Sequence, residues 1–371
     1  MAAERGPLEA LEAALDPRQP LADGWSVYAD ALCERGSVLG ERLALGLAQA
    51  RAESVAQRSA LEREIASFER RHAKALWGPR WLEAERAPDF AERLSIVRVH
   101  GQIVEAHIYC RSARPYEEVE VLLNLLNQTP IARALQVLGL HRRCSVSVAA
   151  GLAIAMSRAA EFQSLRGLVV DNHREPTANP SARLSGLGLP ERPSSIDRMD
   201  IRALLEAWPK LRWLSIAGIE HTRRLESASL EELEIVGCRV RDSLGSMRLS
   251  ALRSLHYGGY TTTPFWTTAR LGQLRSLSLQ IYDRANRQRV GGFEQFIDFV
   301  LAEPLPESVR ELGLANSQLQ GPAVRRLVRE RAHFQRFDRL DLSRNRIDRM
   351  SVDLLRWALP RVEIGEQFPE A

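Results

Sequence analysis

The chain contains almost no lysine. Only Lys74 and Lys210 are lysines among the 51 basic residues, so arginine supplies nearly all the positive charge. This preference is more typical of a GC-rich genome than of selection for phosphate binding. The 47 acidic residues leave a net charge of only +4, and nucleic-acid binding requires basic residues that cluster on one face. The composition therefore argues against a nucleic-acid-binding protein.

Cysteine is also scarce, and the cysteines are far apart. The four are Cys33, Cys110, Cys144 and Cys238. None belongs to a C-x-x-C pair, so the spacing predicts neither a zinc site nor a disulfide framework. We expect buried free thiols.

The sequence has no long apolar run. No segment approaches the roughly 18 uninterrupted apolar residues of a membrane-spanning helix. The first 15 residues include Glu4, Glu9 and Glu12, whereas a secretory signal has a basic start and an unbroken apolar core. These features predict a cytoplasmic protein with no membrane segment.

The common motifs of catalysis and nucleotide binding are missing. The sequence contains no G-x-x-x-x-G-K-[ST], no G-x-S-x-G and no H-E-x-x-H. His100 and His107 are seven residues apart, and on adjoining strands this spacing rarely aims both rings at one ion. We therefore expect no enzyme: no catalytic residue, no metal and no cofactor.

A recurring six-residue pattern, L-x-x-L-x-L, is the most informative feature that is present. Copies or near copies begin at residues 135, 165, 211, 230, 252, 274, 309 and 337. The copies at 211, 230, 252 and 274 are 19, 22 and 22 residues apart, close to the roughly 20 to 29 residues of a leucine-rich repeat. Each copy predicts one strand of a parallel sheet. Apolar stripes at helical spacing, such as Ile201 to Trp208, predict return helices behind the sheet.

The pattern resembles that of bacterial leucine-rich repeat proteins. The copy at Leu340 fits the consensus through Asn345, but most other copies lack the asparagine at that position. The resemblance implies an α/β fold, an irregular solenoid with a curved parallel sheet on the concave side and helices on the convex side. A repeat scaffold displays a surface, so its function depends on the residues that face outward.

The N-terminal region predicts helices and no strand. The segment from Tyr28 to Glu41, within a match over residues 7–50, resembles the repeat-companion module of bacterial proteins, although Ala31 and Ser37 depart from its pattern. This resemblance implies an all-helical cap before a repeat array. We interpret Asp30 and Glu41 as a helix-side charge and a cap of the next helix rather than as a catalytic pair. We therefore expect a helical module over residues 1–90.

The second expected domain is the irregular solenoid, residues 91–371. It begins with a hairpin over residues 94–108 and contains a Pro/Ser/Asn-rich insertion at residues 171–198. A partial copy of the repeat at residues 184–189 leaves open whether part of the insertion forms a strand. A last copy at residues 359–364 should close the sheet.

Candidate binding residues follow from strand geometry. In L-x-x-L-x-L the leucines point inward, so the third and fifth positions stand on the concave face. The candidates from these positions are Trp213, Ser215, Glu232, Glu234, His256, Ser278, Glu311, Arg339 and Asp341. Trp213 beside Glu232 and Glu234 has the composition of a binding hot spot, an aromatic anchor with a charged rim. The alternative is that the insertion simply covers Trp213.

The sequence thus predicts a non-enzymatic scaffold that binds a protein partner through the concave face or the inserted loop. The alternative function is binding to nucleic acid or an anionic surface through a stripe of arginines that flank strand leucines. These arginines are Arg142, Arg166, Arg212, Arg253 and Arg275. The sequence indicates neither the partner's identity nor the oligomeric state.

Overall fold

A computed structural model shows a mixed α/β chain that divides into two units, Met1–Val170 and Asp171–Ala371. The structure describes residues 7–16, 19–110, 115–142, 148–162, 164–171, 197–198, 201–217, 219–221, 225–240, 247–259, 266, 269, 271, 273–281, 293–317 and 319–367. The predicted copy at residues 184–189 and most of the predicted insertion lie outside the described residues. The predicted domain boundary near residue 90 stays a prediction.

The first unit begins with helices, as the sequence predicts. They are α1 (Pro7–Ala14), α2 (Asp23–Cys33), α3 (Val38–Ala50), α4 (Val55–Arg71), α5 (Ala73–Trp77), α6 (Pro79–Ala84) and α7 (Phe90–Arg93). Gly36 ends the α2 turn in the left-handed region (φ 67°), and the Ser54 side chain accepts a hydrogen bond from the Gln57 amide at the start of α4. Trp25 and Tyr28 are fully buried in the packing of α2.

The same unit contains the first strands of the sheet. The predicted hairpin is present as antiparallel strands β1 (Leu94–Val99) and β2 (Gln102–Cys110), and β3 (Val137–Arg142) pairs with β2 in parallel. Strand β4 (Gly167–Asp171) neighbours β3. The connections contain α8 (Pro115–Gln128), the 3-10 helix η1 (Pro130–Ala132), α9 (Val148–Ser157) and the 3-10 helix η2 (Ala159–Glu161). Contacts of α8 with β2 and of α9 with β3 place both helices against the sheet.

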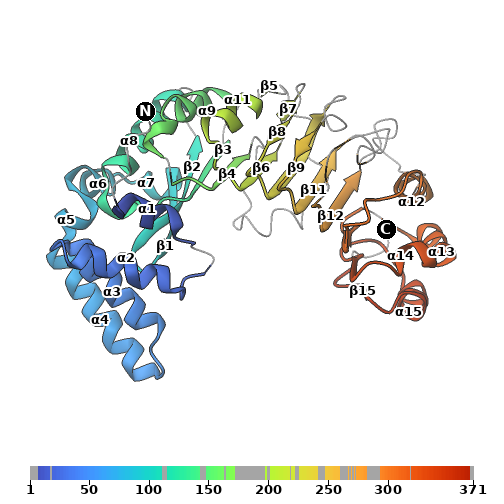
Figure 1. The fold of residues 1–371 in the computed structure, drawn as a ribbon, viewed down its shortest axis with the longest axis horizontal. Helices are drawn as coiled ribbons and strands as arrows, with labels where there is room; N and C mark the ends of the chain where they lie inside the picture. Colours follow the sequence, from blue (N-terminus) through green and yellow to red (C-terminus); the bar gives the residue numbers. More distant parts are fainter. Residues whose placement is uncertain are drawn as a thin grey trace. The chain divides into compact units, whose positions relative to one another are not determined.

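The second unit contains parallel strands at the predicted copies of the repeat (Figure 1). In spatial order they are β6 (Trp213–Ala217), β9 (Glu232–Val240), β11 (Ser254–Gly259), β12 (Ser276–Ile281), β13 (Glu311–Gly313), β14 (Arg339–Asp341) and β15 (Val362–Glu363). One leucine from each of the first six strands lies in lateral register with the next, and all six are buried. The leucines of the repeat therefore form the core, and β15 closes the sheet where expected.

Return helices flank the beginning and end of this unit. The predicted apolar stripes form α11 (Ile201–Ala207), α12 (Phe293–Leu301) and α13 (Gly321–Arg329), and two further helices are α14 (Arg331–Phe334) and α15 (Arg349–Ala358). Asn345, the asparagine of the repeat consensus, is fully buried. Its side chain accepts from the amides of Ser317 (2.9 Å) and Leu319 (3.0 Å), and donates to the Leu314 and Leu342 carbonyls.

In the central block of copies, residues 211–279, the described parts of the returns do not contain the convex-side helices that the resemblance implies. The described returns between β6 and β11 are extended, and contain β7 (Ile219–His221), β8 (Glu226–Ser227) and β10 (Arg248–Leu249), while β5 (Asp197–Arg198) pairs with β7. A repeat of 19 to 22 residues that already contains a strand leaves little length for a helix and two turns. Buried Leu225 and Leu249 take the inward positions instead.

Two smaller findings concern the cysteines and the membrane. Cys110 is buried as expected, but Cys33, the last residue of α2, is exposed, so the expectation is wrong there. Cys144 lies outside the described residues, and the side chain of Cys238 is not described. Among the helices that the structure describes, none combines the length and apolarity needed to span a bilayer.

Candidate functional site

The nine candidate residues share one face of the sheet in the second unit, here called the polar face. They occupy two rows that run across the strands. The first row is Trp213, Glu232, Ser254, Ser276, Glu311 and Arg339, and the second is Ser215, Glu234, His256, Ser278, Gly313, Asp341 and Glu363. Neighbours in a row are paired in register, at the roughly 4.8 Å separation of adjacent strands.

Strand alternation places these side chains opposite the leucine core. Along β6, Leu214 and Ile216 are buried while Trp213 and Ser215 remain partly exposed. The sequence therefore located the face from the period of two alone.

Glu234 is a buried carboxyl in the second row, between Ser215 and His256. Its side chain accepts a hydrogen bond from the Ser215 hydroxyl (Oγ to Oε2, 2.7 Å), and only 8% of the residue is exposed. Burial raises the pKa of Glu234 and the Asp171 carboxylate adds to the rise, while the Ser215 hydrogen bond lowers it. This carboxyl is held closer to its neutral form than a surface glutamate.

His256 lies between Glu234 and Ser278 in the same row. Its ring atom Nε2 is inaccessible to solvent and forms no hydrogen bond, although part of the residue is exposed. Burial lowers the pKa of His256 to about 4, so the imidazole is neutral at pH 7. The order carboxylate, imidazole, hydroxyl matches a catalytic triad, but Nε2 has no partner, so the hydrogen bond that would activate Ser278 is not formed.

The ends of the polar face differ in chemistry. Trp213 is half-buried next to Glu232 on β6 and β9. At the other end, Arg339 donates to Glu363 (2.7 Å). Including Glu363 of β15, the two rows contain five carboxyl groups and one guanidinium. The face is therefore mainly acidic, with an aromatic side chain at one end.

The predicted arginine stripe is only partly correct. Arg142 lies at the carboxyl end of β3 and is buried, and both Arg142 and Arg166 belong to the first unit. The error arose because an arginine can flank a leucine at either end of its strand. In the second unit, Arg212, Arg253 and Arg275 do precede the strands.

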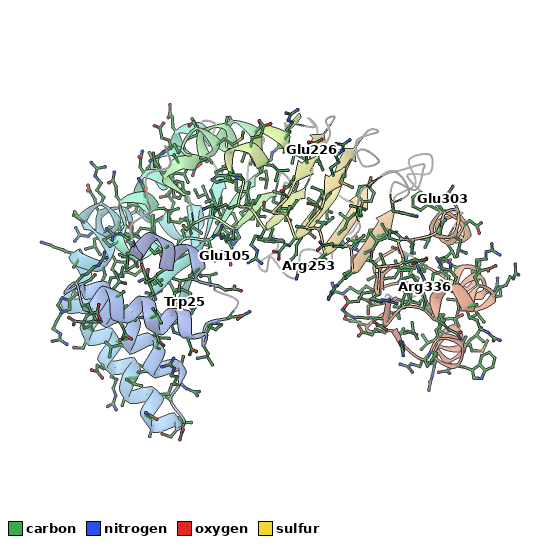
Figure 2. The ribbon with its side chains drawn as sticks, in the orientation of Figure 1. Trp25, Glu105, Glu226, Arg253, Glu303 and Arg336 are labelled. Atoms are coloured by element: carbon green, nitrogen blue, oxygen red, sulfur yellow. The ribbon has the colours of Figure 1, made fainter. Side chains whose placement is uncertain are left out.

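The residues that directly precede the strands form a third row, and some of its members were not predicted from the sequence. Successive backbone hydrogen bonds link Arg212, Glu231, Arg253, Arg275, Arg310 and Asp338. Arg212 is paired with Glu231 (2.6 Å), whereas Arg253, Arg275 and Arg310 are exposed on consecutive strands. Figure 2 shows Arg253 at one end of the strands, on the side of the sheet away from Glu226.

A polar cluster in the first unit was also missed. His107 Nε2 contacts Glu105 Oε1, and His107 Nδ1 lies 2.7 Å from His141 Nε2. The Tyr109 ring stacks on His141 at a centroid distance of 4.8 Å. His107 and His141 come from adjacent strands and are 34 residues apart in sequence, so only the strand register could have indicated the pair.

Gly139 makes this histidine pair possible. It faces His107 across β2 and β3, and a Cβ there would lie 2.0 Å from His107 Nδ1. His100, seven residues before His107 in the sequence, lies instead at the β1–β2 turn. Within the described ranges, no group of three or more His, Cys, Asp or Glu side chains could hold one metal ion.

The comparisons with known proteins concern the fold. No protein-family model matches the chain, and no curated protein matches it either. Among solved structures, the chain is similar to a crystal structure of a Bacteroides fragilis protein, with a TM-score of 0.51 and 12% sequence identity. The match covers 84% of this chain and 85% of that one. At this identity the similarity shows a shared fold and nothing about activity.

Proposed function

We propose that the chain is a cytoplasmic, non-enzymatic leucine-rich repeat protein whose polar face binds a basic segment of a protein partner. The repeated parallel strands and the fully bonded Asn345 support a repeat solenoid. Helices α1–α7, which include the segment resembling the repeat-companion module, would cap its first strand.

The observation that supports binding is His256 Nε2, which lies on the polar face and is one of seven buried side-chain atoms in the described part of the chain that have no hydrogen bond. A buried polar atom without a hydrogen bond destabilises the fold, and native proteins retain few such atoms. A sheet face with only a structural role would favour an apolar or fully solvated residue there. Buried Glu234 and half-buried Trp213 on the same face are also costly if nothing binds. A partner would give these groups contacts that the isolated chain lacks.

The charge of the polar face indicates the partner's chemistry. Exposed carboxylates such as Glu311 attract lysine or arginine, and the Trp213 ring provides an apolar and cation-binding surface. We therefore expect a lysine- or arginine-rich segment, with at least one apolar side chain that packs against Trp213.

The test is an affinity capture with matched variants of the whole chain. We expect Trp213→Ala and Glu311→Arg each to lose a protein that the wild type captures. Trp357→Ala and Glu303→Arg are the controls, since they remove an exposed tryptophan and reverse an exposed glutamate away from the polar face. A partner retained by both polar-face variants, or lost equally from the controls, would show that the polar face is not the binding site.

A second candidate function is nucleic-acid binding, which the row of Arg253, Arg275 and Arg310 favours. Three exposed guanidiniums on consecutive strands could contact successive phosphates. Affinity should then fall steeply with salt, and Arg275→Ala should reduce the slope by about one unit. Absence of DNA and RNA binding at low salt would eliminate this function.

A further inference from the structure

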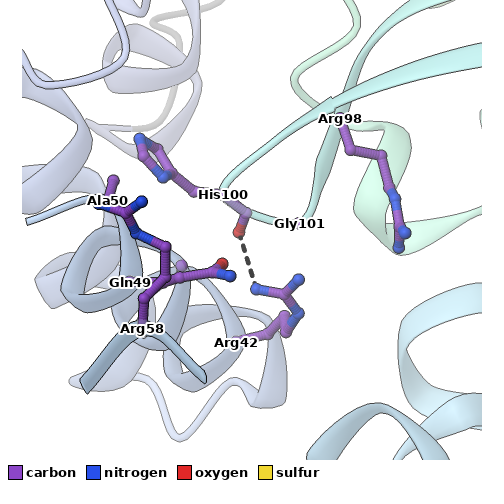
Figure 3. A pocket seen from close by; sticks show the side chains of 8 residues that line it. Arg42, Gln49, Ala50, Arg58, Arg98, His100 and Gly101 are labelled. Carbon is purple, nitrogen blue, oxygen red and sulfur yellow. Dashed lines mark hydrogen bonds between the residues drawn. The ribbon is translucent and has the colours of Figure 1, made fainter. Parts of the chain in front are cut away.

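A pocket of about 460 Å³ lies in the first unit, between helices α3 and α4 and the turn that joins β1 to β2 (Figure 3). Its polar lining is basic or neutral. The residues that define its chemistry are Arg42, Gln49, Arg58, Arg98 and His100. None of the described residues that line it has a carboxylate. The volume is within the range of small-molecule sites.

Arg42 is fixed at the base of the pocket. Only 7% of the residue is exposed; its Nε donates to Glu69 Oε1 (2.7 Å) and its Nη1 to the His100 carbonyl (3.3 Å). Gly101 has a positive φ of 91°, and a Cβ there would lie 2.7 Å from Arg42 Cζ. The glycine therefore lets the turn close over the guanidinium, which cannot move without disturbing the turn.

Two further arginines line the pocket from different elements. Arg98 of β1 donates to Glu69 (3.5 Å) and its guanidinium lies 5.3 Å from the centroid of a Trp77 ring. Arg58 of α4 donates to the Ala52 carbonyl (3.4 Å). A guanidinium has five N–H donors, so most of the donors on these three arginines are not used in the bonds described.

The charges near the pocket do not balance. Glu69 is the carboxylate shared by Arg42 and Arg98, and Glu62 accepts a hydrogen bond from Gln49 at a longer 3.4 Å. Three guanidiniums against the carboxylates of Glu69 and Glu62 leave an excess of one positive charge near the pocket. A phosphate monoester has nearly two negative charges at pH 7, and guanidinium forks match its oxygens.

We infer that this pocket binds the phosphoryl group of a small soluble phosphoester. Arg58 of α4 and Arg98 of β1 provide charge-assisted hydrogen bonds. Arg42 provides a fixed charge at the base of the pocket, and the Gln49 amide adds a neutral donor. The pocket is larger than a phosphate ion, so the organic part of the ligand also fits. This site is in the first unit and does not depend on the proposed function of the polar face.

Calorimetric titration of the full chain at low salt tests the proposal. The probes are inorganic phosphate and AMP, with adenosine as the uncharged counterpart. We expect saturable binding of both anions and none of adenosine. Arg58→Ala and Arg98→Ala should each weaken binding by about tenfold, the usual effect of losing one charge-assisted hydrogen bond. Both side chains are exposed, so the variants should remain folded.

Arg63→Ala is the matched control, because Arg63 is an exposed arginine of the same helix α4 that does not line the pocket. It removes the same charge and should leave affinity unchanged. The proposal is wrong if neither anion binds saturably, if adenosine binds as tightly as AMP, or if Arg63→Ala weakens binding as much as Arg58→Ala.

Discussion

Substitution of His256 by leucine should remove a large part of the acid sensitivity of the fold. Burial holds the pKa of His256 at about 4, whereas the same side chain titrates near 6.5 when exposed in the unfolded chain. Between these values the unfolded state binds more protons than the folded state. The free energy of unfolding therefore falls as pH decreases through this window.

The size of the effect follows from these two pKa values. Between pH 7 and pH 5 the histidine alone should lower the free energy of unfolding by about 2 kcal/mol. Glu234 acts in the opposite direction, because its raised pKa gives stability at low pH that is lost as pH rises. It is present in both proteins, so the difference between wild type and variant isolates His256 to first order.

Urea unfolding of both proteins at the two pH values, followed by circular dichroism, measures this difference. His256→Leu should be neutral or stabilising at pH 7, because it removes a buried nitrogen that has no hydrogen bond. Its loss of stability at pH 5 should be smaller than the wild-type loss by about 2 kcal/mol. Equal losses in both proteins would refute the reasoning, since His256 would then be solvated in the folded state.

Three further predictions concern other parts of the chain. Gly139→Ala should lower the free energy of unfolding, measured in urea, by about 2–3 kcal/mol, because the new Cβ would displace the His107 ring. The control Gly24→Ala should be neutral or slightly stabilising, because nothing lies within 4 Å of its Cβ. Similar effects of the two substitutions would contradict this prediction. Asn345→Ala should lower the free energy of unfolding by about 2–4 kcal/mol in the same assay, because it leaves buried backbone groups without hydrogen bonds. A loss no larger than that of an ordinary surface substitution would show that these hydrogen bonds do not stabilise the repeat. Under native conditions a maleimide should label Cys33 but not Cys110, as measured by peptide mass spectrometry, and label on Cys110 without denaturant would show that its strand opens.

Much of the secondary structure could be predicted from local pattern. The period of two in each copy of L-x-x-L-x-L predicted strands and which side of them is buried, because burial of alternate residues is a local property of a strand. The N-terminal region was expected to be helical and without strands, and helices α1 to α7 are found there.

The returns in the central block could not be predicted in the same way. Their apolar residues, such as Leu225 and Leu249, fit either a short helix or an extended segment, and the choice depends on the length available between strands. The exposure of Cys33 depends on how α2 ends and packs, which composition does not indicate.

Predicting the candidate sites required information of different kinds. The polar face needed only the alternation along each strand, so all nine residues were located there. The Glu105–His107–His141 cluster and the Arg42 pocket needed the register between β2 and β3 and the packing of α3 on a turn about 55 residues later. Both depend on a glycine that allows two distant side chains or segments to approach, a role that the sequence alone does not reveal.

The glycines at these two places also limit how the clusters can be explained. Gly139 and Gly101 each occupy a position where a Cβ would displace a polar group, His107 Nδ1 in one case and the Arg42 guanidinium in the other. At Gly139, if the polar groups only filled space, an alanine with a smaller neighbouring side chain would pack equally well and would restrict the unfolded chain more. At Gly101 the positive φ of 91° itself favours glycine. The structure instead brings ionisable groups together at the backbone. The pocket therefore tests this reading directly, since loss of anion binding in Arg58→Ala and Arg98→Ala with an intact fold would separate a ligand site from a packing contact.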